Sequence, residues 1–277
     1  PYLMGAISLI GEEEEDTEPL AREAMLRILK DKLEEYGTVN QRVAKEIHPA
    51  LMLIGDLKEM LKQIPIQMPW DYTVCQAILE CNTLSGKYEA VLQTLMTEME
   101  VYRIKKEFQE KVKADIASAK EQSDFVIVCP HWGTEYSLHP DSMQKKWTKI
   151  FAESGVDLVL GTHPHVIEPI EWVEDETTGH QMLVYYSLGN FVNWTSSSGD
   201  GIANRMVGGM AEITVGFDEA GRGFIVDYGV NALVTQVEPG HNGVTTYFLK
   251  DYTDEMAGKN AIIEQDANFS REYCTKL

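Results

Sequence analysis

The chain has 277 residues and is acidic, with 44 Asp and Glu against 24 Lys and Arg and a formal net charge of −20. This length suffices for one large domain or for two ordinary ones with a sizeable core. Such a charge repels nucleic-acid phosphates and anionic membrane faces, so we expect no nucleic-acid partner.

The sequence shows no targeting or anchoring segment. No apolar run approaches the roughly 18 residues that cross a bilayer, and no signal peptide is recognisable. The chain starts at Pro1 rather than Met, so we expect a fragment or a processed product, and the missing signal does not fix its compartment. The four cysteines form no CxxC pair and no zinc-knuckle spacing, so they do not indicate a disulfide scaffold.

The first part of the chain has the apolar spacing of helices. A first helix is predicted to end at Gly37, with the acidic run Glu12 to Asp16 complementing its N-terminus. Further helices and the breaks between them are predicted from the apolar spacing and from Pro and Gly: helices at about 39–64, 71–84 and 87–120, breaks at 65–69 and 85–86. We therefore expect an α-helical segment of unknown role over residues 1–104.

The stretch LMLIGDLKEM in this segment allows two interpretations. It could be a strand that ends in Gly55-Asp56, the form in which many metallophosphoesterases present an aspartate ligand. Its flanks, HPAL before and KEMLKQ after, instead continue a helical repeat, and we favour the helix.

After Gln122 the pattern changes to short β-branched or aromatic runs that end at Gly, Pro, Asn or His. DFVIVCP and VDLVL read as buried strands, and SMQKKWTKIFAESG between them reads as a helix that stops at Gly155. A strand, a helix and a second buried strand favour parallel pairing in an α/β sheet. Later strands such as GMAEITVGF and GFIVDYGV, joined by DEAGRG, are expected to be antiparallel.

Histidines follow both of the predicted parallel strands. His131 stands after the first strand, and His163 and His165 stand after the second. Since functional groups gather at the carboxyl ends of strands in such sheets, three imidazoles are expected to converge on one rim. They indicate either a divalent metal site for Mn, Fe or Zn, or ordinary hydrogen-bonded loop histidines. The ordinary interpretation is the one we favour for the remaining four: His48, His139, His180 and His241.

The second half also resembles a known family. Over about residues 105–217 it is similar to the bacterial capsule-synthesis CapA family, also called the poly-gamma-glutamate synthesis protein family, a branch of the calcineurin-like metallophosphoesterase superfamily. The resemblance rests on four motifs in order: DFVIVCPHWGTEY, GVDLVLGTHPHVIEPIEW, VYYSLGNFV and RMVGGMAEITV. It implies a partial metallophosphoesterase-like mixed β-sheet sandwich over residues 105–277.

The resemblance also assigns roles to residues. His131, His163 and His165 match the superfamily's metal-ligating and catalytic histidines, although Thr162 stands where relatives often carry another His. Glu135 and Tyr136 match the Glu-Tyr that lines the cleft. Four residues are therefore expected near the substrate: Glu135, Tyr136, Asn190 and Arg205. For Asn190 a tight strand-end turn in which Gly189 takes φ > 0 explains the motif equally well, and Arg205 could instead pair with a surface acid.

One departure from the family concerns the ligands. Family members carry upstream Asp and Asn ligands, and residues 1–104 contain no convincing counterpart. A two-metal hydrolase needs a bridging carboxylate and several ligands per ion. Either the helical segment replaces the first half of the fold and leaves a degenerate site, or the chain is a fused or misassembled product.

Three functions follow from these observations. The first is a CapA-like protein that makes or handles an anionic polymer such as poly-gamma-glutamate. By the resemblance it could act as a metal-dependent hydrolase, together with other capsule-synthesis proteins at the cell surface. The second is a non-catalytic protein whose helices bind a partner. The third is a metal-dependent phosphoesterase that acts on small phosphoesters.

Overall fold

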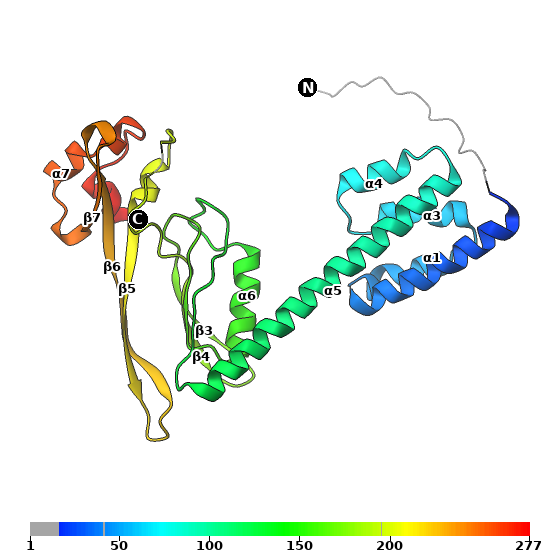
Figure 1. Cartoon of the computed structure of the whole chain (residues 1–277), viewed down its shortest axis with the longest axis horizontal. Coiled ribbons are helices and arrows are strands. Elements are labelled where there is room, and N and C mark those ends of the chain that lie inside the picture. Colours follow the sequence, from blue (N-terminus) through cyan, green and yellow to red (C-terminus); the bar gives the residue numbers. More distant parts are fainter. Residues whose placement is uncertain (1–16, 41, 195) are drawn as a thin grey trace. The chain divides into compact units, whose positions relative to one another are not determined.

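The computed structural model describes residues 17–40, 42–194 and 196–277. The chain forms two compact units, with the boundary between Glu110 and Lys111 (Figure 1). The predicted acidic run from Glu12 to Asp16 lies outside the described residues. Among the described residues, no helix combines the length and the apolar character needed to span a membrane.

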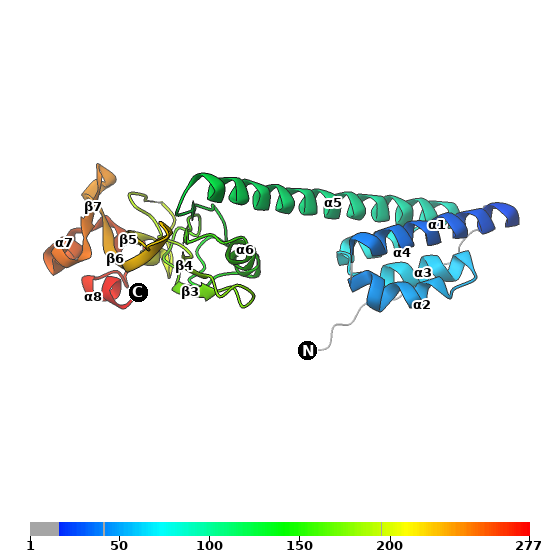
Figure 2. The same cartoon turned by 90° about the horizontal axis from the view of Figure 1, so that it is seen from below.

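The secondary-structure elements of unit 1 are all helices, among its described residues. They gather around the first part of the longest helix (Figure 2). Sixteen buried apolar side chains, among them Leu33, Leu61 and Val91, form its core. Its helices are α1 (Pro19–Val39), a π-helix (Val43–Ile47), α2 (His48–Met52), α3 (Leu57–Gln67), α4 (Tyr72–Leu79) and the first part of α5 (Leu84–Gln122).

Asp56 is a helix cap. Its side chain accepts a hydrogen bond from the backbone N–H of Glu59 and so satisfies a free donor in the first turn of α3. The favoured helical interpretation of this stretch is confirmed, although residues 53–56 interrupt the helix that was predicted at 39–64. The strand interpretation is wrong.

Three predicted helix breaks are misplaced by a few residues, since the helices are interrupted at 40, 68–71 and 80–83 instead. Helix α3 continues through Pro65 to Gln67, and Pro65 is buried in the core, so packing outweighs the lost N–H. Helix α5 starts at Leu84 and includes Ser85 and Gly86 in its first turn, where N–H groups lack helical partners anyway. Helix α1 continues past Gly37 to Val39.

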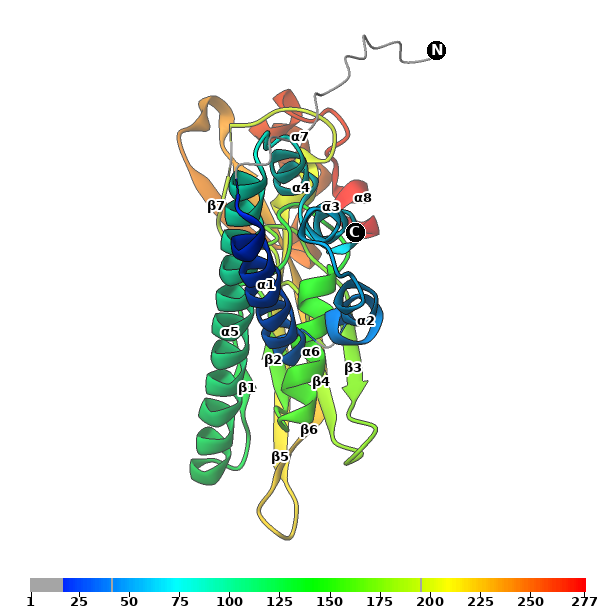
Figure 3. The same ribbon diagram turned by 90° about the vertical axis from the view of Figure 1, so that its right-hand side faces the viewer.

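Unit 2 contains a four-stranded mixed sheet in the order β1-β2-β4-β3 (Figure 3). The predicted parallel pairing of the first two strands is confirmed, and β4 joins them in parallel while β3 runs antiparallel to β4. Strand β3 was not predicted. The strands are β1 (Ile127–Val128), β2 (Leu158–Leu160), β3 (Ile170–Glu174) and β4 (Gln181–Tyr185).

The predicted helix between β1 and β2 is α6 (Ser142–Glu153). It begins at a capping box: the Asp141 carboxylate accepts from the Gln144 backbone N–H, and the Gln144 side chain accepts from the Asp141 N–H. It ends before Gly155, whose φ of 76° favours glycine. The apolar face of α6, with Phe151 and Ala152, packs with the end of α5 and with residues of the sheet, including Val159 and Val184.

A second, antiparallel sheet covers the opposite face, in the order β5-β6-β7. Ala211, Ile213 and Ile225 of its hairpin pack against Leu158, Leu183 and Tyr185. The predicted antiparallel pair is confirmed, whereas β7 was not predicted. The remaining elements are β5 (Val207–Phe217), β6 (Gly223–Val237), β7 (Val244–Phe248), α7 (Asp254–Lys259), α8 (Arg271–Lys276) and four 3-10 turns at Ile202–Met206, Pro239–His241, Leu249–Asp251 and Ala261–Glu264. The predicted mixed α/β class is thus confirmed: helices, then a mixed sheet, then a small antiparallel sheet.

Candidate metal centre

The carboxyl ends of β1 and β2 bring the first two histidines together. The pairing of the strands continues beyond β1 and β2 as a parallel bridge between His131 and Thr162, where Trp132 N–H donates to the Thr162 carbonyl over 3.0 Å. The rings of His131 and His163 are consequently neighbours, with centroids 4.5 Å apart. The centroid of His165 lies 6.0 Å from that of His163.

Three side chains offer a set of metal-ligating atoms. One donor atom each from Glu135, His163 and His165 lies within 4.8 Å of the others. Two donors that share an ion at about 2.1 Å are at most about 4.2 Å apart, so the three need at most small side-chain adjustments to bind one ion. Two imidazoles and a carboxylate suit Zn, Mn or Fe. Among the described residues this is the group of His, Cys, Asp and Glu that meets the spacing, and it fits a divalent ion.

The backbone is strained at three residues of this site. Tyr136, His163 and His165 have φ of 67°, 109° and 60°, in a region that side-chain-bearing residues rarely adopt. Each such residue costs about 1–3 kcal/mol, and such residues cluster where function requires a particular geometry. A direct hydrogen bond of 2.7 Å from Tyr136 N–H to the Pro164 carbonyl ties the two loops together and supports this conformation.

Asn190 fixes the tautomer of His165. Its amide nitrogen donates to the Arg205 carbonyl over 3.0 Å, which orients the amide so that its oxygen faces His165 Nδ1 at 2.9 Å. An amide oxygen can only accept, so His165 Nδ1 carries the proton and Nε2 keeps the lone pair that a metal requires. Asn190 is buried and uses both polar groups inside the protein. The predicted φ > 0 at Gly189 is confirmed, at 65°.

The Arg205 side chain packs on the ring of Tyr136, which is a neighbour of His165. The Arg205 guanidinium carbon is 3.5 Å from the centroid of the Tyr136 ring, a close cation–π contact. That ring in turn lies 6.1 Å from His165, and Tyr136 is 45% exposed, so the pair borders solvent. The Arg205 Nε atom is buried and has no hydrogen-bond partner among the described residues. Arg205 is therefore paired with an aromatic face rather than with the surface acid that was the alternative.

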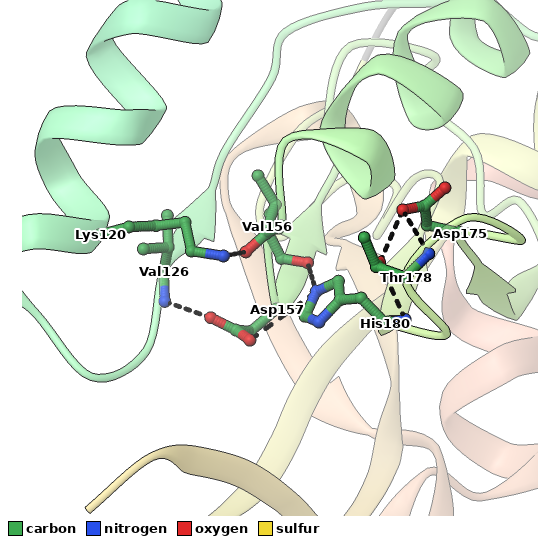
Figure 4. A network of polar contacts seen from close by, with 8 residues as sticks. Lys120, Val126, Val156, Asp157, Asp175, Thr178 and His180 are labelled. Carbon is green, nitrogen blue, oxygen red and sulfur yellow. Dashed lines mark hydrogen bonds and ion pairs between the residues drawn. The ribbon is translucent and has the colours of Figure 1, made fainter.

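The amino ends of the same strands carry a different polar network (Figure 4). The Asp157 carboxylate accepts from Val126 N–H over 2.7 Å, His180 Nε2 donates to the Val156 carbonyl over 2.7 Å, and Lys120 donates to Gly155. These bonds hold the starts of the strands together. The prediction of an ordinary hydrogen-bonded histidine is confirmed for His180. His48 lies in helix α2, within the helix predicted at 39–64, and its Nε2 has no hydrogen-bond partner among the described residues.

The site residues were only partly assigned by sequence reasoning. Glu135 was expected to line the cleft and contact the substrate, but the structure brings it to the histidines as a third donor. His131 lies beside His163 and outside that group of donors. Contacts of Glu135, Tyr136, Asn190 and Arg205 with a substrate stay predictions. All four cysteines are free.

Comparison with known proteins matches the part of the chain that carries the candidate site, together with the last part of unit 1. A family model described as bacterial capsule synthesis protein PGA_cap matches residues 72–195. The chain is also 42% identical over 83 residues to the PGA biosynthesis protein CapA of Bacillus subtilis (strain 168), a match that covers 29% of this chain and 20% of that protein. Part of this chain is a PGA_cap capsule synthesis domain. The PGA_cap match includes His131, Glu135, His163, His165 and Asn190.

Two further relatives are similar to the chain. The capsule biosynthesis protein CapA of Bacillus anthracis is 37% identical over 79 residues, 27% of this chain and 18% of that protein. A Lon protease of Lachnoclostridium phytofermentans is 32% identical over 127 residues, 46% of this chain and 16% of the protease. Each match covers a fifth or less of the relative's length. The similarity therefore concerns only a part of these longer proteins.

Proposed function

We propose that unit 2 is a metal-dependent, hydrolase-type module that handles an anionic capsule polymer such as poly-gamma-glutamate. The observation that carries this proposal is the convergence of Glu135, His163 and His165 within 4.8 Å in a PGA_cap domain. A divalent ion bound there would polarise a carbonyl or phosphoryl oxygen of the substrate. The name of the Bacillus subtilis relative, a PGA biosynthesis protein, supports the polymer.

The protein's own side chains would bind and orient that substrate. The Nε donor of Arg205 is buried and lacks a partner in the part of the chain that the structure describes, and the guanidinium fork suits a carboxylate of the polymer. Tyr136 holds the guanidinium by its ring. Asn190 keeps His165 in the tautomer that leaves Nε2 free. The formal net charge of the chain is −20, which repels a polyanion. The local positive charge of Arg205 and of a bound ion would offset this repulsion at the site.

We further propose that unit 2, from Lys111 onward, corresponds to the later part of a metallophosphoesterase-like sandwich, so that the boundary expected at residues 104/105 falls a few residues later, within α5. The packing of the β5–β6 hairpin on the mixed sheet supports the sandwich. His131, whose ring is tilted by 54° against that of His163, would then belong to the same centre as a further ligand. The upstream carboxylates of the family remain without a counterpart, since Asp56 is engaged as the cap of α3.

Metal analysis tests the proposal. Purified parent protein, incubated with Mn²⁺ and desalted, should retain metal, and the variants His163→Ala and His165→Ala should not. The loaded protein should then cleave poly-gamma-glutamate. Turnover of a chromogenic phosphodiester in its place would favour the phosphoesterase alternative, and a parent chain without bound metal would refute the site.

A second proposal concerns unit 1, which we propose binds a protein partner. Leu53, Ile66 and Tyr72 are large apolar side chains that are 66–88% exposed. A partner captured by the full chain should be lost with the double variant Leu53→Glu, Ile66→Glu. Equal capture by both proteins would contradict this role.

A further inference from the structure

A buried hydrogen bond joins the first turn of helix α6 to the segment that follows His165. Gln144 Nε2 donates to Glu168 Oε2 over 2.6 Å, and the two residues are 0% and 7% exposed. Gln144 lies in the first turn of α6, whereas Glu168 lies three residues after His165. Burying an amide and a carboxyl group costs free energy because both lose their hydrogen bonds to water. A buried Gln–Glu pair therefore indicates a specific structural role.

Gln144 contacts the loop that carries Glu135 and helps to fix its position. Its side-chain oxygen accepts from Asp141 N–H over 2.9 Å, and the Asp141 carboxylate accepts from the Thr134 hydroxyl over 2.9 Å. Gly133 lies against the same amide: a Cβ atom there would be 2.7–2.8 Å from the Gln144 side chain. The position of Gln144 thus limits where residues 133 to 135 can lie.

Glu168 helps to fix the position of the loop that carries His163 and His165. Its backbone N–H donates to the Ser187 carbonyl over 3.1 Å, and the Ser187 hydroxyl donates to the Val166 carbonyl over 2.8 Å. These bonds attach the segment after His165 to the end of β4. The side-chain hydrogen bond that Gln144 donates to Glu168 therefore couples the position of one loop to that of the other.

We propose that Gln144 and Glu168 are positioning residues that hold Glu135 at ion-binding distance from His163 and His165. This inference rests on the proposed function. The backbone bond between Tyr136 and Pro164 keeps the loops together without the pair, so loss of the pair loosens the donor geometry more than it unfolds the unit. Residues that orient metal ligands typically change metal affinity by about 10–100-fold.

The test is a Co²⁺ titration of the full chain, followed by visible absorption, beside thermal unfolding of the metal-free protein. Glu168→Leu and Gln144→Met replace each partner by an apolar side chain of similar size. Both should weaken Co²⁺ binding by about 10–100-fold and change the absorption bands. Glu168→Gln keeps an oxygen that accepts from Gln144, so it should bind Co²⁺ within a few-fold of the parent. Thr148→Val, which removes a buried hydroxyl from the same helix, is the matched control.

The outcomes distinguish a positioning role from a purely structural role of the pair and from the absence of a metal site. Weak binding by the apolar variants, with normal binding by Glu168→Gln and an unfolding temperature that does not follow the affinity, supports positioning. Parental Co²⁺ affinity in both apolar variants overturns it, and so does a loss of affinity that merely follows thermal stability across all variants, Thr148→Val included. If the parent itself binds no Co²⁺, the proposed function fails, and the positioning role fails with it.

Discussion

Gly161 is the residue at which the fold leaves no room for a side chain, directly before the histidine loop. A Cβ atom at this position would lie 2.0 Å from the Tyr186 carbonyl oxygen and 2.5 Å from Trp132 Nε1. These two atoms are joined by a buried hydrogen bond of 2.9 Å. The variant Gly161→Ala must therefore move β2 away from β4 or break this bond.

The cost of Gly161→Ala follows from two effects. Overpacking of a filled interior costs about 1–3 kcal/mol, and a buried donor left without its acceptor costs about 1–3 kcal/mol. We expect the free energy of unfolding to fall by about 2–6 kcal/mol and the urea midpoint to fall by more than about 1 M.

Urea unfolding followed by tryptophan fluorescence measures this loss in unit 2. Four of the five tryptophans report on that unit, since only Trp70 lies in unit 1. Gly229→Ala is the matched control, because a Cβ atom there meets nothing within 4 Å and its midpoint should stay the same or rise slightly. Equal midpoints for Gly161→Ala and the parent would refute the close packing of β2 against β4.

Three further predictions concern the same unit. Trp132→Phe loses the donor to the Tyr186 carbonyl and should lower the free energy of unfolding by about 1–3 kcal/mol in the same assay. Burial raises the pKa of Glu168, so the folded protein holds this proton more tightly than the unfolded chain. Stability from this group is therefore complete below about pH 4.3, the ordinary Glu value, and falls as the pH rises towards the raised pKa. Glu168→Gln should remove that fall in urea titrations at several pH values; an unchanged slope would contradict the raised pKa. Finally, Mn²⁺ at about 100 times its Kd should stabilise the parent by about 2.7 kcal/mol, and His165→Ala should abolish this gain in thermal unfolding.

The strand-helix-strand unit could be predicted from the sequence because its signals are local. VDLVL is a short apolar run, and the apolar spacing of the intervening segment has the helical period with Gly155 as its stop. The convergence of His131 and His163 followed from the parallel pairing alone, since both follow strands that end at one edge. Such features need no knowledge of distant contacts.

Other features depend on contacts that a pattern does not contain. Pro65 predicts a break, yet burial in the core of unit 1 keeps it inside a helix. Glu135 reaches the histidines through a turn in which Gly133 and Tyr136 have φ of 91° and 67°. A glycine signals the first of these values, but nothing in the residue type of Tyr136 signals the second. Strand β3, with exposed Ile170 and Trp172, lacks the buried alternation that identifies a strand.

The central claim is that Glu135, His163 and His165 hold one divalent ion. Anomalous diffraction from crystals of the full chain soaked in Mn²⁺ tests it most directly. We predict a peak within about 2.3 Å of a donor atom of each of the three residues, lost in His165→Ala crystals. A map without a peak at this place, at a Mn²⁺ concentration that saturates other sites, would contradict the account.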